Sequence, residues 1–404
     1  MSETILVLNA GSSSLKFQLF AIEHRQKLDR LVKGQVEGIG VDPHLVMKSA
    51  RGEILKDLRW PAGELATPHQ ALEQVVQALR EYLGGALPVA VGHRVVHGGI
   101  HFSAPTVIDG DVIERLEPLV PLAPLHQPHN LTPIKIIHER LPNVVQVACF
   151  DTAFHRTHST LADRYAIPES LYAEGVRRYG FHGLSYEFIA ERLKTIAPSI
   201  AQGKIIVAHL GSGASMCAIS NGKSIDSTMG FTALDGLPMG TRPGQLDAGV
   251  VLFLVQQKGM APAQVEHFLY HDCGLKGLSG VSNDVRVLLA SKEPNARLAL
   301  DYFVYRIAAF AGALAATMEG LDGFVFTAGI GENAPAIRTA VAKRLAWLGL
   351  EMDEQANEHG DPLISTGQSR IACYVIPTDE ELMIARHTLD CMEASNTRLG
   401  KEVR

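Results

Sequence analysis

Runs of hydrophobic residues that end in small polar turns recur along this 404-residue chain. In the most informative one, the apolar residues Ile205–Ala208 continue through HL into the turn GSG. The chain begins in the same way, because Ile5–Leu8 lead into a turn around Gly11. Such a run followed by glycine and serine predicts a buried strand and a tight turn. The repetition predicts a duplicated domain, although either stretch alone is equally typical of an ordinary β-hairpin.

Each of these two turns predicts a place for a phosphate group. Backbone N–H groups and hydroxyls in a tight turn point into one concave space that suits phosphate oxygens. Glycine at the two bends, Gly11 and Gly211, allows positive φ and lets a ligand approach the backbone closely. The pair of turns therefore predicts a phosphate-bearing ligand held between two facing loops.

The rest of the hydrophobic pattern predicts strands first and then alternating helices and strands. Further strands are expected at Ser14–Phe20, Pro88–His97, Val144–Phe150, Gly323–Thr327 and Ile371–Ile376. Helices are expected at Pro68–Leu83, from Asp109, at Thr132–Leu141, Tyr186–Ile196, Val250–Lys258, Pro262–His271, Ala296–Met318 and Ala334–Leu348, and from Asp379. Pro121–His129 predicts a rigid connection, and 224–242 predicts a long glycine-rich loop. This order indicates the α/β class with a mixed sheet.

Composition and charge indicate a globular protein of the cytoplasm. The formal net charge is −6 without a run of Lys or Arg, which argues against a nucleic-acid partner. The five cysteines form no CxxC pair, as expected in a reducing compartment. The chain opens with MSET and enters a strand at once, so no signal peptide is expected. We also expect no stretch with the roughly 20 apolar residues of a membrane span.

Three charged residues stand where a charge needs a partner. Asp151 ends the apolar run VVQVACF, and open α/β sheets bind ligands beyond the carboxyl ends of their strands. A helix N-cap is the alternative for this aspartate. Arg94 and Arg242 lie beside glycines in apolar surroundings, where an arginine requires an acid or an anion. The two arginines could clamp a carboxylate and a phosphoryl group, while each alone fits a structural ion pair equally well.

Two further segments indicate a nucleotide site. Asp284, in SNDVR, either caps a helix or binds a ribose or an adenine edge. The segment 329–333, GIGEN, follows a predicted strand and precedes a predicted helix. A glycine turn in this position would form an anion cradle at a helix N-terminus.

The histidines favour hydrogen-bond donation over metal binding. His93, His97 and His101 are four residues apart and would align on a helix as zinc ligands, but glycines at 98 and 99 interrupt any helix. No zinc site is therefore expected. A second set adjoins glycine or proline turns and offers donors to a developing phosphate charge, with a structural role as the alternative. This set is His126, His182 and His209.

No GxxxxGK[ST] loop and no protein-kinase HRD or DFG set is present. The residues by themselves therefore favour phosphoryl transfer on a scaffold without a P-loop.

A series of segments resembles the acetate kinase family and follows the expected order over nearly the whole chain. These segments are Asn9–Lys16, Gly92–Gly99, Phe150–His155, Arg178–Gly183, His209–Ser215, Gly240–Arg242, Ser282–Arg286, Phe326–Asn333 and Pro377–Glu381. The resemblance implies the fold of the acetate and sugar kinases, Hsc70 and actin, with two ribonuclease-H-like domains, an active site in the cleft between them, and a homodimer. The domains are expected at 1–151, with 382–404 packing back on it, and at 152–381.

The resemblance also implies a reaction, in which ATP and acetate give ADP and acetyl phosphate reversibly, with Mg²⁺ or, in its place, Mn²⁺. By motif, Asn9 and Glu380 would serve the metal. Arg94 would hold the acyl carboxylate, Asp151 would orient or activate it, and Arg242 and His182 would stabilise the transferring phosphoryl group. The acyl pocket would consist of Val96, Leu125 and Phe181. ATP would contact Lys16, His209, Leu210, Gly211, Ser212, Gly213, Asp284, Val285, Arg286, Gly329, Ile330, Gly331, Glu332 and Asn333.

The chain departs from the family pattern at a few positions, which leaves its preferred acid open. These are Ser212 for an asparagine, Ala233 for a proline, Pro243 and Gln245 in the segment after Arg242, and Asp379 for an asparagine. A kinase of propionate or another short-chain acid is therefore an alternative. A non-catalytic ATP switch of the actin or Hsc70 type is another, but a switch needs no arginine clamp for an acid. No nucleic-acid or membrane partner is expected.

Overall fold

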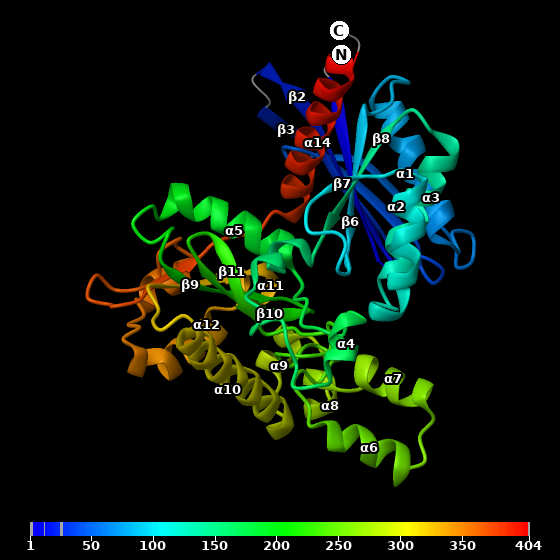
Figure 1. The fold of residues 1–404 in the computed structure, drawn as a ribbon. Helices are drawn as coiled ribbons and strands as arrows, with labels where there is room; N and C mark the ends of the chain where they lie inside the picture. The colour runs from blue at the N-terminus through cyan, green and yellow to red at the C-terminus, as the bar shows by residue number, and fades with distance from the viewer. Residues whose placement is uncertain (1–2, 12, 25–26, 403–404) are drawn as a thin grey trace. The chain divides into compact units, whose positions relative to one another are not determined.

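The computed structural model describes residues 3–11, 13–24 and 27–402. The chain divides into two compact units, which we call unit 1 (Met1–Ala153 with Asp379–Arg404) and unit 2 (Phe154–Thr378) (Figure 1). The units divide after residues 153 and 378, whereas the expected domain boundaries followed residues 151 and 381.

Unit 1 is built on an eight-stranded sheet with the order β5-β4-β3-β2-β1-β6-β8-β7. Its strands are β1 (Thr4–Ala10), β2 (Leu15–Glu23), β3 (Lys27–Glu37), β4 (His44–Ser49), β5 (Ile54–Arg59), β6 (Ala90–Val95), β7 (Thr106–Val107) and β8 (Val145–Phe150). Its helices are α1 (Pro68–Tyr82), α2 (Gly110–Leu116), the 3₁₀ helix η2 (Glu117–Leu122), α3 (Gln127–Arg140) and α14 (Glu380–Glu402). Strand β1 pairs antiparallel with β2 and parallel with β6, and β6 pairs parallel with β8.

Helices cover both faces of the central strands of unit 1. Leu6 and Leu8 of β1 belong to the core that includes Leu72 of α1, while α14 packs against β1, β6 and β8 (Figure 1). Strands buried on both faces carry continuous apolar runs, which explains the run from Ile5. A Cβ on Gly92 would lie 2.6 Å from Cγ2 of Ile384, so glycine at this point of β6 allows the close approach of α14.

Unit 2 contains a five-stranded sheet with the order β11-β10-β9-β12-β13. Its strands are β9 (Lys204–Leu210), β10 (Ala214–Ser220), β11 (Lys223–Ser227), β12 (Gly323–Thr327) and β13 (Ala372–Val375). Its helices are α4 (Glu169–Ala173), α5 (Gly183–Ile196), α6 (Ala248–Gln256), α7 (Pro262–His271), α8 (Gly274–Ser279), α9 (Val285–Ala290), α10 (Pro294–Thr317), α11 (Ala328–Asn333), α12 (Pro335–Leu345) and α13 (Glu354–His359). Two short 3₁₀ helices are η3 (Ala153–Thr157), at the junction of the units, and η4 (Ala346–Leu348).

The two sheets share one topology, which confirms the predicted duplication. In unit 2, β9 pairs antiparallel with β10 and parallel with β12, and β12 pairs parallel with β13. The order β11-β10-β9-β12-β13 thus repeats the order β3-β2-β1-β6-β8 of unit 1. Each of the two matching sequence stretches is also a β-hairpin, so the hairpin interpretation is correct at the local level. Only the sheet order shows that the hairpins are equivalent.

The two matching turns do not use the conformational freedom of glycine. Neither Gly11 nor Gly211 has a positive φ, and each turn is closed by a backbone hydrogen bond, from Gly11 N to Ser14 O at 2.8 Å and from Gly211 N to Gly213 O at 3.0 Å. The segment Pro121–His129, expected as a rigid connection, contains the end of η2 and the start of α3. Proline is tolerated in the first turn of a helix, where its missing N–H has no helical partner.

The prediction of a glycine turn at GIGEN is wrong. Residues 328–333 form the short helix α11, and the positive φ of this segment, +65°, belongs to Ala328. Gly329 and Gly331 are helical residues and do not form a glycine-rich loop. The next helix, α12, begins at Pro335. The sequence pattern of a strand followed by two glycines did not distinguish a turn from a helix that begins directly after the strand.

Helix α10 matches the helix expected at Ala296–Met318 closely, but it contains a longer apolar stretch than the sequence analysis expected. Among the described helices it is the one whose length and composition would suffice to cross a membrane. It packs against α8, α12 and β10, and nine of its side chains, including Phe303 and Ile307, are buried. Burial against neighbouring helices gives this apolar composition the role of a core helix.

Candidate active site

In unit 1, Arg94 and Asp151 form a buried, bidentate ion pair. Arg94 lies on β6, and Asp151 follows the parallel neighbour β8, with its backbone N donating to Val95 O at 3.0 Å. Nε and Nη2 of Arg94 donate to Oδ1 and Oδ2 of Asp151 at 3.0 and 2.7 Å. The structural ion pair considered for Arg94 is therefore present, and Asp151 is its partner. The third guanidinium nitrogen, Nη1, takes no part in this pair.

A second carboxylate, Glu380, begins α14 close to Arg94. Its Oε2 lies 3.7 Å from Arg94 Nη1, which is an ion pair but too long for a hydrogen bond. Burial, together with the negative charges of Asp151 and Glu381, raises the pKa of Glu380 to about 7, although Arg94 opposes this shift. Burial by itself would lower the pKa of Arg94, but these carboxylates raise it above its ordinary value. The guanidinium therefore remains charged.

The predicted metal residues Asn9 and Glu380 both lie in unit 1. Asn9 is on β1, against which α14 packs, and Glu380 is the first residue of α14. Amide and carboxylate oxygens are ligands that Mg²⁺ accepts, and this ion usually takes only one or two protein carboxylates beside substrate phosphates and water. No group of three or more His, Cys, Asp or Glu side chains that could hold a metal occurs within 3–11, 13–24 and 27–402. The donor set fits magnesium better than zinc.

Lys16 lies opposite Asn9 on β2 and lines a groove of about 460 Å³ in unit 1. Lys33 and Lys48 line the same groove, together with Glu381. Three lysines beside one glutamate make the groove positively charged, which suits the predicted contact of Lys16 with a nucleotide phosphate.

In unit 2, Arg242 is a cation without an acidic partner. Its Nη1 donates to the backbone oxygen of Ala233 at 2.8 Å. In the part of the chain that the structure describes, no carboxylate lies within 4.0 Å of its guanidinium. Burial lowers the pKa of Arg242, but an arginine keeps its proton in proteins. A desolvated charge of this kind is stabilised when an anion binds to it.

His182 lies beside Arg242 in an unusual backbone conformation. It is the N-cap of α5, with φ 58° and ψ 24°. Its Nδ1 is hydrogen-bonded to Ser215 Oγ at 2.8 Å, and its ring stacks on His209 with 4.1 Å between ring centroids. A Cβ on Gly213 would lie 2.9 Å from Arg242 Nη2 and 3.3 Å from His182 Nε2. Glycine at 213 therefore provides the space in which the two side chains converge.

Most of the residues predicted to bind ATP surround one cavity of about 480 Å³ in unit 2. It is lined by Gly211, Ser212, Asn283, Asp284, Val285, Arg286, Gly329, Ile330, Asn333 and Ala334. Sequence reasoning did not predict Asn283, which lies within the matching segment Ser282–Arg286, or Ala334, which directly follows Phe326–Asn333. Among the predicted residues, His209, Leu210, Gly213, Gly331 and Glu332 do not line this cavity. Glu332 Oε1 instead accepts from the backbone N of Ala328 and of Thr378, at 2.8 and 3.2 Å.

Asp284 serves as a helix cap. Its Oδ1 accepts from the backbone N of Arg286 at 2.8 Å, at the start of α9. The guanidinium of Arg286 is hydrogen-bonded to the same carboxylate and lowers its pKa. The capping interpretation is therefore correct. A role in holding a nucleotide remains compatible with it, since both residues line the cavity.

The three residues predicted for the acyl pocket do not all belong to one unit. Val96 is buried and Leu125 is half-buried, and both belong to unit 1. Phe181 is buried and belongs to unit 2. The backbone N of Val96 donates to Asn130 Oδ1 at 2.9 Å, and Asn130 Nδ2 donates to the backbone O of Ala10 at 2.8 Å. Asn130, which the sequence analysis missed, thus ties Val96 to the end of β1.

His126, the remaining histidine proposed as a donor, occupies the N-cap position of α3 in unit 1. Its role as a donor stays a prediction.

The structure explains two of the departures from the family pattern. Asp379 Oδ1 caps α14 by accepting from Leu382 N at 3.0 Å, and its other carboxylate oxygen pairs with Arg30. The additional carboxylate next to Glu380 is thus neutralised within unit 1. Ala233 contributes its backbone oxygen to Arg242, a contact that any residue can make.

Solved structures with the same fold come from two kinds of kinase. An acetate kinase from Porphyromonas gingivalis matches with a TM-score of 0.85 and 38% identity, over 97% of this chain and 100% of that chain. A propionate kinase from Francisella tularensis matches with a TM-score of 0.88 and 37% identity, over 96% and 99%. The fold of this chain is therefore that of the acetate and propionate kinases.

Sequence comparison defines the family. Residues 4–386 match the Acetokinase family. The acetate kinase of Nitrobacter hamburgensis is 60% identical over 96% of each chain, and that of Rhizobium meliloti is 54% identical over 98% of this chain and 100% of its own length. The chain belongs to the acetokinase family.

Proposed function

We propose that this chain is an acetate kinase, which transfers the γ-phosphoryl group of ATP to acetate and forms acetyl phosphate and ADP reversibly. The observation that carries the proposal is the pair formed by Arg242 and His182, which converge across Gly213 while Arg242 has no carboxylate partner among the described residues. A guanidinium that lacks an anion, beside an imidazole that can donate, suits the oxygens of a transferring phosphoryl group. The cavity of about 480 Å³ in the same unit is large enough for a nucleotide.

The chemistry asks for positioning and positive charge more than for a base. Acetate is ionised at neutral pH, so its oxygen needs no deprotonation before it attacks phosphorus. Arg94 keeps Nη1 for the substrate carboxylate, since its other donors are bound to Asp151. Asp151 then acts by fixing the orientation of Arg94. Arg242 and His182 stabilise the charge on the phosphoryl oxygens in a loose, in-line transition state.

We further propose that Asn9 and Glu380 serve a divalent cation, Mg²⁺ or Mn²⁺, when ATP is bound. Bound there, the cation would neutralise charge on the phosphate oxygens. Burial beside Asp151 and Glu381 keeps the pKa of Glu380 high in its absence. A cation near Glu380 would stabilise the ionised carboxylate.

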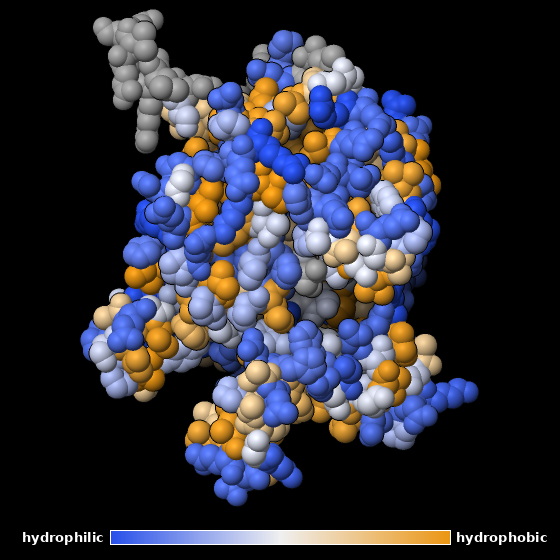
Figure 2. Space-filling model, turned by 90° about the vertical axis from the view of Figure 1, so that its right-hand side faces the viewer, coloured by the Kyte–Doolittle hydropathy of each residue, from blue (hydrophilic) through white to orange (hydrophobic). Residues whose placement is uncertain are grey.

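We also propose a homodimer of cytoplasmic location. All nine residues of α6, AGVVLFLVQ, are apolar except the last, yet none is buried. Val250, Leu252, Phe253 and Val255 of this helix are exposed. On the face shown in Figure 2, hydrophobic side chains are interspersed with hydrophilic ones. An unpaired apolar helix is typical of a subunit interface. The five cysteines are free thiols, as expected in the cytoplasm.

Hydroxamate-coupled assays with ATP and Mg²⁺ test the proposed reaction on acetate, propionate and butyrate. A preference for acetate is expected, because buried Val96 limits the proposed pocket. Val96→Ala should shift the ratio of kcat/KM values toward propionate by about tenfold, since one methylene is worth about 1–3 kcal/mol. Val95→Ala is the control, as the neighbouring valine is also buried but belongs to the core beneath β6.

The outcomes of this assay separate the candidate functions. A wild-type preference for propionate would keep the mechanism and favour the second candidate, a propionate kinase, which the solved structure from Francisella tularensis supports equally on fold. No acyl phosphate from any acid, despite tight ATP binding, would refute the enzyme proposal.

A further inference from the structure

A buried histidine outside the proposed site, His155, holds the turn that carries two proposed site residues. The turn contains Gly180 with φ +74° and His182 with φ +58°, so two of its residues have left-handed backbone. His155 Nε2 lies 2.9 Å from the backbone oxygen of Phe181. That oxygen belongs to the peptide between Phe181, of the proposed acyl pocket, and His182, of the proposed phosphoryl site. This one hydrogen bond therefore constrains both Phe181 and His182.

Packing leaves this ring little freedom. His155 lies on η3 and is fully buried. A Cβ on Gly180 would be 2.6 Å from its Cδ2 and 2.7 Å from Cγ, so the imidazole lies directly against the glycine backbone. Its ring also meets Tyr186 edge-on, at 5.6 Å between centroids. Any tilt of His155 would move the turn.

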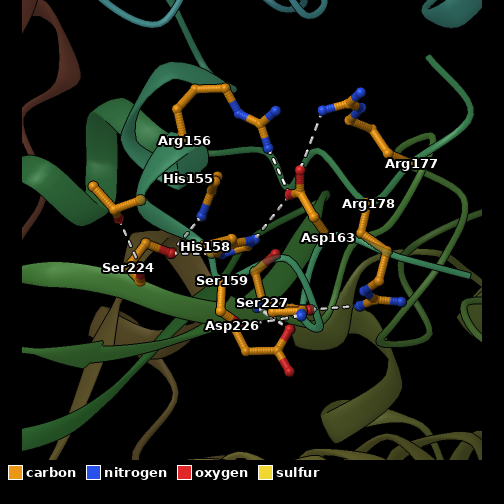
Figure 3. Close-up of polar contacts among 12 residues, drawn as sticks. His155, Arg156, His158, Ser159, Asp163, Arg177, Arg178, Ser224, Asp226 and Ser227 are labelled. Carbon is orange, nitrogen blue, oxygen red and sulfur yellow. Dashed lines mark hydrogen bonds and ion pairs between the residues drawn. The ribbon is translucent and has the colours of Figure 1, made fainter. Parts of the chain in front are cut away.

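The hydrogen bond to Phe181 fixes which nitrogen of His155 carries the proton, and Ser224 bonds to the other nitrogen (Figure 3). The Phe181 carbonyl can only accept, so His155 Nε2 is the donor. In the neutral ring Nδ1 then accepts from Ser224 Oγ, which lies 2.8 Å away. His158 Nε2, at 2.9 Å, donates to the same hydroxyl oxygen. The donors thus point one way along the chain of bonds from His158 through Ser224 and His155 to Phe181.

Charged groups surround the far end of this chain of bonds. Burial and the positive charges nearby lower the pKa of His158 to about 2, so its ring stays neutral. Asp163 Oδ1 lies 3.9 Å from His158 Nδ1 and accepts from Arg156 Nη2 at 2.7 Å, while Asp163 Oδ2 accepts from Arg177 Nη1 at 3.5 Å (Figure 3). The consecutive hydrogen bonds from His158 to Phe181 restrict the His155 ring, which is what a positioning group requires.

We infer that His155, oriented by Ser224, is a positioning residue that sets the places of Phe181 and His182 for phosphoryl transfer and for selection of the acid. The inference rests on the proposed function, because it takes His182 and Phe181 as site residues. A misplacement of about 1 Å at a reacting group can cost about 10²-fold in rate. A purely structural histidine would affect stability and leave the choice of acid unchanged.

Variants at 155 and 224 test the inference through kcat, KM and the acetate-to-propionate ratio. His155→Phe keeps a ring but removes the donor, and should lower kcat by about 10- to 100-fold and change the ratio of kcat/KM values for the two acids. His155→Gln places an amide N–H near the position of Nε2 and should restore most of kcat. Ser224→Ala should lie between them. If His155→Phe does not fold, Ser224→Ala still tests the inference.

A matched control is Ser365→Ala, which removes another buried serine hydroxyl of unit 2. Ser365 Oγ accepts from Cys373 N at 3.0 Å, in a bond that involves none of the proposed site residues. It should lower the melting temperature without changing the acid ratio. If His155→Phe and Ser224→Ala behave like this control, the inference is overturned. A wild-type protein that forms no acyl phosphate would instead refute the proposed function.

Discussion

The two arginines singled out from the sequence differ in their surroundings, and this difference separates their roles. Arg94 is bound to Asp151 through two hydrogen bonds and has Glu380 nearby. Among the described residues, the Arg242 guanidinium is hydrogen-bonded only to the backbone oxygen of Ala233. A neutralised guanidinium can orient a ligand, whereas one without an anion attracts the developing negative charge of a transition state. The same residue type thus serves two purposes.

Substitution of Arg242 by lysine should therefore affect turnover. We expect Arg242→Lys to lower kcat by about 10²-fold with a much smaller change in KM for ATP, because an ammonium group cannot keep both the bond to Ala233 and contact with a phosphoryl oxygen. Steady-state kinetics with saturating acetate measures both constants. Arg297→Lys, in an exposed ion pair with Asp301, should leave them unchanged. Equal losses in the two variants would contradict this role.

Strand β6 carries Arg94 beside a buried histidine that makes the element sensitive to acid. His93 Nε2 is hydrogen-bonded to Gln146 Oε1 on β8 at 2.8 Å, and its Nδ1 has no hydrogen-bond partner. Burial lowers the pKa of His93 from 6.5 to about 4. The folded protein therefore needs this ring neutral, while the unfolded chain takes up a proton below about pH 6.5.

Stability should accordingly fall as the pH drops from about 6.5 to 4. In this range His93 is protonated in the unfolded state but remains neutral in the folded state. The free energy of unfolding therefore decreases, by at most about 3 kcal/mol for His93. His93→Gln can still donate to Gln146 and should show a flatter pH dependence in urea unfolding. His101→Asn, at an exposed histidine, is the control and should follow the wild type. An unchanged slope in His93→Gln would show that another group dominates.

At the scale of the whole molecule, duplication accounts for the two hairpins, and the exposed helix α6 indicates assembly. A two-fold dimer brings the same surface of two copies together, so an apolar helix of one subunit can pack against the same helix of the other. None of its side chains is buried in the isolated chain. The proposed dimer would remove this surface from water.

A charge on α6 should therefore dissociate the protein. Phe253→Glu places a carboxylate among the exposed apolar residues of the helix and should convert a dimer into a monomer at micromolar concentration, as measured by sedimentation velocity. Gln256→Glu adds the same charge at an exposed polar position of α6 and should remain dimeric. A wild-type protein that sediments as a monomer, or a Phe253→Glu variant that stays a dimer, would contradict the proposal.

The sequence by itself determined the class of fold, the duplication and most of the candidate residues. Strand periodicity is local, so the runs from Ile5 and Ile205 indicated buried strands without further information. The motifs placed Ser212, the residues 284–286 and Asn333 in one functional group, and the structure gathers them around one cavity. These features could be predicted from the sequence because each depends on a few neighbouring residues.

Tertiary structure alone decided the contacts between distant segments. His155 and Ser224 are 69 residues apart, and their bond to the turn before His182 has no local signal in the sequence. The sequence also could not distinguish a glycine turn from the helix α11, because Ala328 and not a glycine adopts the positive φ. That Asp151 binds Arg94, and that no acid of the described residues reaches Arg242, depends on how the chain folds back on itself. Ion pairs depend on the distance between charges in the folded protein, which cannot be read from their separation along the sequence.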